Sequence, residues 1–214
     1  MTDTLRPSPA LHTARRFWAD EGGASLVEFA LVITLFLFLL LAIIDFGRIG
    51  HAWVGANKAT QLTARLAAVR PPVCAGVPLR NNRGDAVAAP AYGALCRAGS
   101  GVCFAAPAAT CTGSAANATA LEIFTAIRPL IPAGTTIGQM RYSYAFDPNL
   151  GFLGGPYVPM VTVEFTSVNF TFISQLGVFL TAMTGQNSTL GTPLNMPGMS
   201  VSLPGEDLAL GTEG

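Results

Sequence analysis

The feature that most constrains this chain is a run of sixteen uncharged residues, Phe29–Ile44, bounded by Glu28 and Asp45. At a helical rise of about 1.5 Å per residue the run covers about 24 Å, slightly less than a bilayer core of roughly 30 Å. The apolar neighbours on either flank bring it into the spanning range. A buried core helix is the alternative, but the rest of the chain is too small to cover bulky side chains on every side of a helix. We therefore expect a transmembrane helix.

A cleaved secretory signal peptide is the competing interpretation of such a run. Signal peptides carry small residues after their apolar core, whereas here Gly22, Gly23 and Ala24 precede the run and residues 45–48 (DFGR) follow it. The run is also longer than the apolar core of a signal peptide. We expect the helix to be retained and any cleavage to fall on its N-terminal side.

Composition favours a membrane or an assembly over an independent soluble domain. Only 11% of the residues are charged, against about 25% in a typical soluble domain. The net charge is zero and Lys and Arg form no block. The chain therefore lacks the basic surface of a nucleic-acid-binding protein, and we expect no nucleic-acid partner.

All four cysteines follow the apolar run: Cys74, Cys96, Cys103 and Cys111. None forms a C-x-x-C pair and both histidines are distant in sequence, so a zinc site lacks its ligand spacing and we expect no metal. Their even number favours two disulfides in an oxidising compartment, with buried free thiols as the alternative. Three connectivities are open, and we prefer the one that closes two short loops, Cys74–Cys96 with Cys103–Cys111.

The cysteines also set the direction of the membrane segment. Arginine and lysine flank the run almost equally on its two sides, so the positive-inside rule gives nearly a tie. An oxidising environment for residues 74–111 places the C-terminal region outside the cytoplasm. We expect a single-pass protein with a cytoplasmic N-terminus.

The helix is expected to continue beyond the membrane. No proline occurs between residues 24 and 70, and Pro71 and Pro72 then end the helix. Three glycines weaken it by up to about 1 kcal/mol each relative to alanine and can mark a bend; they are Gly47, Gly50 and Gly55.

This second part of the helix carries one polar stripe and a broad apolar face. The polar stripe comprises Asn57, Lys58, Gln61 and Arg65. Trp53 lies outside that arc of the helical wheel, and we expect it to belong to the packing face rather than to anchor the chain at the membrane interface.

The remaining chain alternates loop-like and regular segments. Residues 71–116 are rich in Ala, Gly and Pro, and we interpret them as a disulfide-stapled loop region. Residues 117–130 show helical spacing of apolar residues. The apolar stretch 170–183 is broken by polar residues and is expected to form core or interfacial structure, not a second membrane span.

Apolar side chains alternate over residues 140–146 and 161–165, which predicts two strands, and the short connection between them predicts antiparallel pairing. A third short strand is expected at 199–203. The predicted fold class is therefore α+β, with a long N-terminal helix, transmembrane in its first half, and a small disulfide-stapled domain with a short antiparallel sheet. We divide the chain into a leader 1–23, a helical spine 24–70 and an extracytoplasmic domain 71–214.

The segment 22–30 (GGASLVEFA) and the later residues 43–48 (IIDFGR) resemble the TadE/TadG family of minor pilins, or pseudopilins, of tight-adherence (Flp, type IVb-like) pilus systems. The resemblance implies a pilin-like fold, a place in the bacterial inner membrane with a periplasmic domain, and incorporation into a pilus at the cell surface. It also implies two kinds of partner, a prepilin peptidase and other pilin subunits that contact the N-terminal helix. Family members often have proline where this chain has Thr34, so a straighter helix is expected here.

The resemblance also implies a processing and assembly site. In pilin-like proteins the peptidase cuts after a glycine, and a carboxylate five positions into the mature chain assists assembly. Cleavage between Gly23 and Ala24 puts Glu28 at the fifth position, followed by Phe29, whereas cleavage after Gly22 would make it the sixth. The new amine of Ala24 in one subunit can neutralise the carboxylate of Glu28 in another inside an apolar bundle. The alternative is an unpaired Glu28 among lipid headgroups.

The motifs of common enzyme classes (GxSxG, HExxH, GxxxxGK and GxGxxG) do not occur in the sequence. We expect neither catalysis nor a cofactor. The expected function is that of a non-enzymatic minor pilin in pilus assembly and surface adhesion. The alternative is a membrane-anchored binding or adhesion domain outside any filament, which has no need for removal of residues 1–23.

Overall fold

The computed structural model describes residues 23–173, 181, 184–186, 192–206 and 208. The chain divides into two compact units. One comprises Met1–Phe46 with Ile173–Leu190, and the other comprises Gly47–Phe172 with Gly191–Gly214. The expected leader lies outside the described residues except for Gly23, as does most of the apolar stretch 170–183.

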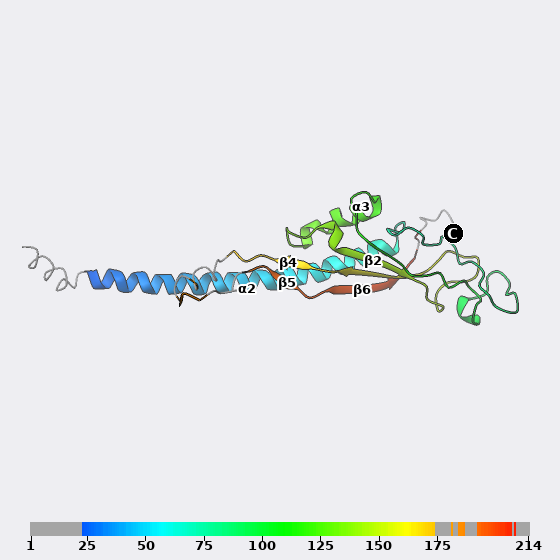
Figure 1. Ribbon diagram of the computed structural model, residues 1–214, viewed down its shortest axis with the longest axis horizontal. Coiled ribbons are helices and arrows are strands. Elements are labelled where there is room, and N and C mark those ends of the chain that lie inside the picture. The colour runs from blue at the N-terminus through cyan, green and yellow to red at the C-terminus, as the bar shows by residue number, and fades with distance from the viewer. Residues whose placement is uncertain (1–22, 174–180, 182–183, 187–191, 207, 209–214) are drawn as a thin grey trace, which may run out of the picture. The chain divides into compact units, whose positions relative to one another are not determined.

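The longest element is helix α2, Ala24–Ala68, a continuous run of 45 residues (Figure 1). It confirms the expected long helix, which ends just before Pro71 and Pro72. The N–H of Glu206 donates to the carbonyl oxygen of Ala68 at 2.8 Å. This bond satisfies one of the carbonyls that a helix end leaves without an intrahelical partner.

The second half of α2 turns a face of small side chains into the hydrophobic core. Six of its residues are at most 1% exposed: Ala56, Ala59, Thr60, Thr63, Ala64 and Ala67. The hydroxyl groups of Thr60 and Thr63 donate to the carbonyl oxygens of Ala56 and Ala59 at 2.8 and 2.7 Å. Because these side chains are short and satisfied, neighbouring elements can pack close to the helix backbone.

The polar stripe of α2 lies where the sequence predicts it, with Lys58, Gln61 and Arg65 exposed. The expectation that Trp53 belongs to the packing face is wrong, since Trp53 is 39% exposed. The buried face is built from Ala and Thr, and an indole ring does not fit where backbones approach this closely.

A four-stranded antiparallel sheet forms the centre of the second unit. Its strands are β1 (Ala109–Thr112), β2 (Met140–Ala145), β3 (Met160–Phe165) and β6 (Met199–Pro204), in the order β1-β2-β3-β6. All three pairings are antiparallel, and Tyr142 of β2 pairs with Val163 of β3. The three strands predicted from alternation are therefore confirmed.

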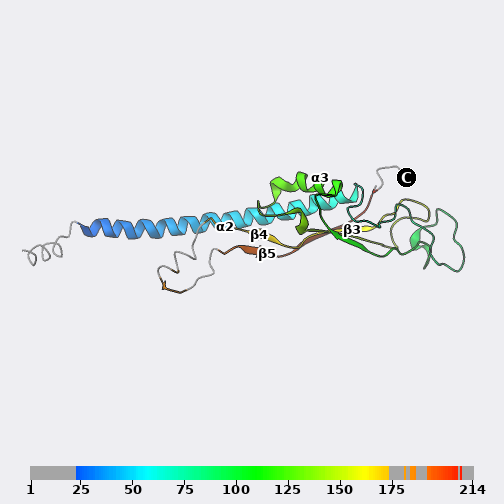
Figure 2. The ribbon, with the colours of Figure 1, turned by 45° about the horizontal axis from the view of Figure 1, so that its top comes forward.

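Three short strands were missed by the sequence analysis. β1 lies in the segment interpreted as loop, because its four small residues carry too little alternation to stand out. The strands β4 (Val168–Phe170) and β5 (Leu194–Met196) form a separate two-stranded antiparallel sheet, seen beside α2 in Figure 2. Runs of three residues are too short for a periodicity signal.

Helix α3, Ala118–Ile127, confirms the helix expected at 117–130 and continues into the 3₁₀ turn η3, Arg128–Leu130. The side chain of Asn117 caps its start by accepting a hydrogen bond from the N–H of Ala120 at 2.9 Å. Ala120, Ile123 and Ile127 are fully buried in the core. Two further 3₁₀ turns are η2 (Cys96–Ala98) and η4 (Ile137–Gln139).

The cysteines form two disulfides, as expected, but the preferred connectivity is wrong. The structure pairs Cys74 with Cys111 and Cys96 with Cys103, with Cα–Cα distances of 5.5 and 5.1 Å. Strand pairing decides this, since β1 sets Cys111 opposite Tyr142 and the Sγ of Cys74 lies 3.6 Å from the carbonyl oxygen of Tyr142. The predicted pairing was chosen because it closes two short loops, and it could not take this contact into account because β1 was not predicted.

Two tyrosines of β2 fill the core beneath α2. Tyr142 and Tyr144 are at most 1% exposed. Burial raises the pKa of both phenols above the ordinary value of 10. The hydroxyl oxygen of Tyr144 accepts a hydrogen bond from the N–H of Val73 at 3.1 Å, which ties the segment after α2 to the sheet.

Gly55 marks the closest approach to α2, and this predicts a sharp difference between two glycines. A Cβ at Gly55 would lie 2.3 Å from the carbonyl oxygen of Leu130, whereas one at Gly50 would meet no atom within 4 Å. We expect Gly55→Ala to destabilise the domain by about 1–3 kcal/mol through overpacking. Gly50→Ala should stabilise the helix by up to about 1 kcal/mol. Thermal unfolding of the full chain in detergent, followed by circular dichroism, measures both; equal shifts would contradict the close packing.

Candidate functional site

The predicted processing and assembly residues lie together at the start of α2. α2 begins at Ala24, directly after Gly23, which has a 3₁₀ conformation. Ala24 and Glu28 are four residues apart in the helix, so their side chains share one face. Both residues are exposed, and so is the neighbouring Phe29.

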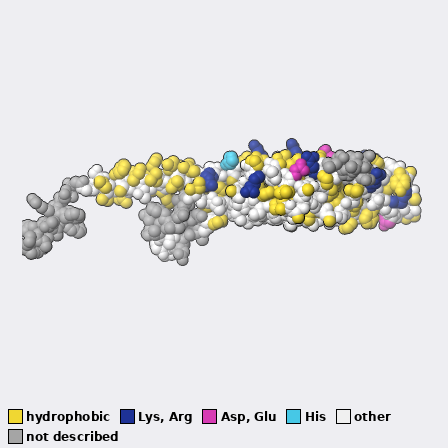
Figure 3. Space-filling model, turned by 90° about the horizontal axis from the view of Figure 1, so that it is seen from above, with side chains coloured by type: hydrophobic (Ala, Val, Ile, Leu, Met, Phe, Trp, Pro, Cys, Tyr) yellow, Lys and Arg dark blue, Asp and Glu magenta, His cyan; other side chains and the backbone are white. Residues whose placement is uncertain are grey.

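We call residues 24–46 of α2 the apolar segment. Its large side chains are exposed on every side of the helix, and Figure 3 shows them in yellow along this part of the chain. Leu31 is 69% exposed, Phe36 is 57% exposed and Leu41 is 41% exposed. These residues point in different directions around the helix, so the described part of the chain buries no apolar face of this segment.

Within α2, a window of mean hydropathy 2.9 is long and apolar enough to cross a membrane, and none of that window is buried inside the structure. A core helix of a soluble domain would hide most of such a window. The segment therefore fits membrane anchoring by its length, its composition and its exposure.

Thr34 stands in the middle of the apolar segment without interrupting it. Its hydroxyl donates to the carbonyl oxygen of Ala30 at 2.7 Å, which satisfies the hydroxyl within the helix. The helix is continuous through this position. A proline there would remove the backbone N–H and break one helical hydrogen bond.

Asp45 has a role that the sequence analysis missed. In the sequence it marks only the boundary of the apolar run, but in the structure it is 2% exposed. Its Oδ1 accepts a hydrogen bond from the N–H of Ile173 at 3.2 Å. A buried carboxylate needs such partners, so Asp45 joins the end of the apolar segment to a distant part of the chain. Only a knowledge of the tertiary fold could have revealed this partner.

The other predicted residues, the four cysteines, lie in the second unit. Cys96 and Cys103 form a small apolar cluster with Val102 and Leu153, apart from the main core. Among the residues that the structure describes, no three His, Cys, Asp or Glu side chains gather to hold a metal ion. The candidate site is therefore a surface: an uncovered apolar helix with one carboxylate near its start.

Comparison with known proteins points to the same part of the chain. The sequence profile of the TadE-like protein family matches residues 23–65. Over these residues the chain is similar to that family. The match covers the apolar segment and most of the small-residue face of α2, and it supports a role in tight-adherence (Tad) pilus systems. No match was found among curated proteins or solved structures.

Membrane anchoring by the TadE-like helix predicts how two pairs of substitutions behave. Each arginine at the centre of a membrane helix costs about 2.5–3.5 kcal/mol of insertion free energy, so the double variant Leu35→Arg/Leu39→Arg should lose stable insertion. The matched pair Leu79→Arg/Leu95→Arg places the same charges at half-exposed positions of the other unit and should leave insertion unchanged. Extraction of membranes with alkaline carbonate separates the outcomes.

If the unaltered chain were extracted by carbonate, or if the Leu35/Leu39 variant resisted extraction as well as the unaltered chain does, this assignment would be contradicted.

Proposed function

We propose that this protein is a non-enzymatic minor pilin-like subunit that supports assembly of a tight-adherence (Flp) type IV pilus, and through it adhesion to surfaces. The observation that carries the proposal is the exposed apolar segment with Glu28 one helical turn after Ala24, directly behind a Gly-Gly pair. The family match over residues 23–65 supports it. Its partners are a prepilin peptidase and the N-terminal helices of other pilin and minor pilin subunits.

The proposed topology follows from the disulfides. The protein lies in the bacterial inner membrane with its N-terminus in the cytoplasm, and residues 71–214 form a periplasmic domain. Both disulfides are then in an oxidising compartment. The peptidase reaches residues 22–24 from the cytoplasmic side, and the apolar segment stays in the bilayer until assembly.

In the filament, helices of neighbouring subunits replace lipid around the apolar segment. A carboxylate carried into that bundle without a partner costs several kcal/mol. The amine created at Ala24 of an adjacent subunit neutralises Glu28 only when the two helices have the correct axial offset. The charge pair therefore selects one register among the many that apolar packing alone would allow.

Processing is tested by the N-terminus of the protein isolated from its native host. We expect the mature chain to begin at Ala24, and Gly23→Leu to leave the leader attached because the bulky side chain blocks the cleavage site. N-terminal sequencing or intact mass measures both. A mature protein that still begins at Met1 would favour the alternative function, a membrane-anchored binding domain that needs no processing.

The carboxylate is tested by substitution of Glu28. Glu28→Ala and Glu28→Gln should leave membrane insertion intact but reduce piliation by at least about tenfold. A loss of ~1.4 kcal/mol of binding free energy at each contact between subunits already lowers the association constant tenfold. Glu28→Asp, which keeps the charge, is the matched control and should retain more pili. Pili are counted by electron microscopy of the native host. Normal piliation in the alanine or glutamine variant would contradict the proposed pairing of Glu28 with the amine of Ala24.

A further inference from the structure

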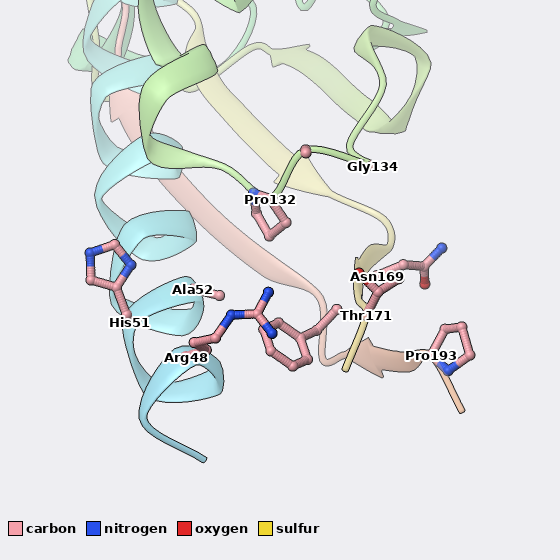
Figure 4. Close-up of a pocket in the computed structure, with 10 residues that line it drawn as sticks. Arg48, His51, Ala52, Pro132, Gly134, Asn169, Thr171 and Pro193 are labelled. Carbon is pink, nitrogen blue, oxygen red and sulfur yellow. The ribbon is translucent and has the colours of Figure 1, made fainter. Parts of the chain in front are cut away.

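A cavity of about 530 Å³ opens beside α2 just after the apolar segment ends (Figure 4). One wall comes from α2, a second from the loop after η3, and a third from β4 and the residue before β5. The described residues that line it are Arg48, His51, Ala52, Pro132, Ala133, Gly134, Asn169, Phe170, Thr171 and Pro193.

The described lining carries basic groups and no acidic ones. Arg48 and His51 are its ionisable side chains, and Asn169 adds an amide. The sequence between Glu164 and Glu206 contains neither Asp nor Glu, so this stretch, which supplies one wall, brings no carboxylate. A cavity of this composition favours an anionic ligand.

Arg48 is held in place by an aromatic ring. Its Cζ lies 5.1 Å from the ring centroid of Phe170, within the range of a cation–π contact. Figure 4 shows the side chain extending from α2 toward Thr171, with Ala52 facing the same space. A guanidinium group positioned in this way offers a fork of N–H donors that suits phosphate oxygens.

The position of the cavity along α2 indicates where its ligand comes from. Arg48 follows Phe46 by two residues, which is about 3 Å along a helix axis. Lipid phosphates lie just outside the hydrocarbon core, so they are at the level of Arg48 when the apolar segment spans the bilayer. His51 is one turn further along the helix and is exposed.

We propose that this cavity binds the phosphate group of one anionic phospholipid, such as phosphatidylglycerol. Arg48, which faces the cavity from α2, binds the phosphate oxygens. The bound lipid fixes the depth of α2 in the bilayer. The proposal rests on membrane anchoring but not on pilus assembly, so it can fail while the proposed function holds.

Native mass spectrometry of the full chain in mild detergent tests the site, with phosphatidylglycerol and phosphatidylcholine offered at equal concentration. We expect one retained phosphatidylglycerol per chain and no comparable retention of phosphatidylcholine. Arg48→Gln should weaken retention by ~10-fold, because it removes the charge-assisted hydrogen bonds, and Arg48→Lys should restore part of it. Arg65→Gln removes the same charge from the exposed stripe of α2 and should change nothing.

A second variant separates a shaped cavity from general attraction to charge. Ala52→Phe fills the cavity and leaves both basic residues in place, so retention should fall as it does for Arg48→Gln. Inorganic phosphate at millimolar concentration should not displace the lipid. Equal retention of the two lipids, full retention in Arg48→Gln or in a folded Ala52→Phe protein, the same loss in Arg65→Gln, or displacement of the lipid by free phosphate would each overturn the proposal.

Discussion

The apolar segment of α2 carries large side chains on all sides of a helix. The described part of the chain does not bury them: Leu31 is 69% exposed and Phe46 is 75% exposed. Each fully buried side chain of this size is worth about 1.5–3 kcal/mol. Left in water, a segment of this length would therefore cost tens of kcal/mol, far more than a small domain can offset. The requirement for an apolar environment, first lipid and then other helices in the proposed assembly, determines what the rest of the molecule can do.

The second half of α2, by contrast, is packed against the protein's own core. There the buried face is made of alanine and threonine, and Gly55 lies against the carbonyl oxygen of Leu130 closely enough to exclude even a methyl group. Close backbone approach leaves little room for adjustment. The helix is thus fixed to the core that β2, β3 and α3 build, and Cys74–Cys111 fastens the chain just beyond its end. The large exposed side chains of the first half allow lipid to be replaced by other helices. The small buried side chains of the second half form a permanent contact with the core of the domain.

The strong periodic signals in the sequence predicted the long helix, α3 and the strands at 140–146, 161–165 and 199–203, because each has enough residues to reveal its period. The signals failed where tertiary contacts decide. The partner of Cys111 depends on the short strand β1, the exposure of Trp53 depends on how closely the core approaches α2, and the burial of Asp45 depends on Ile173, which is far away in sequence. The candidate site at Gly23, Ala24 and Glu28 was recognisable from sequence because it is contiguous; the cavity at Arg48 was not, since its walls come from three separate segments.

The most direct test asks what surrounds the middle of the apolar segment in living cells. A photoreactive amino acid in place of Leu35, which is 62% exposed, would record its neighbours in the native host. The account predicts crosslinks to lipid, and to the N-terminal helices of other pilus subunits when the pilus system is present. Crosslinks confined to residues 47–214 of the same chain would show that the protein covers this helix by itself, and would contradict the account.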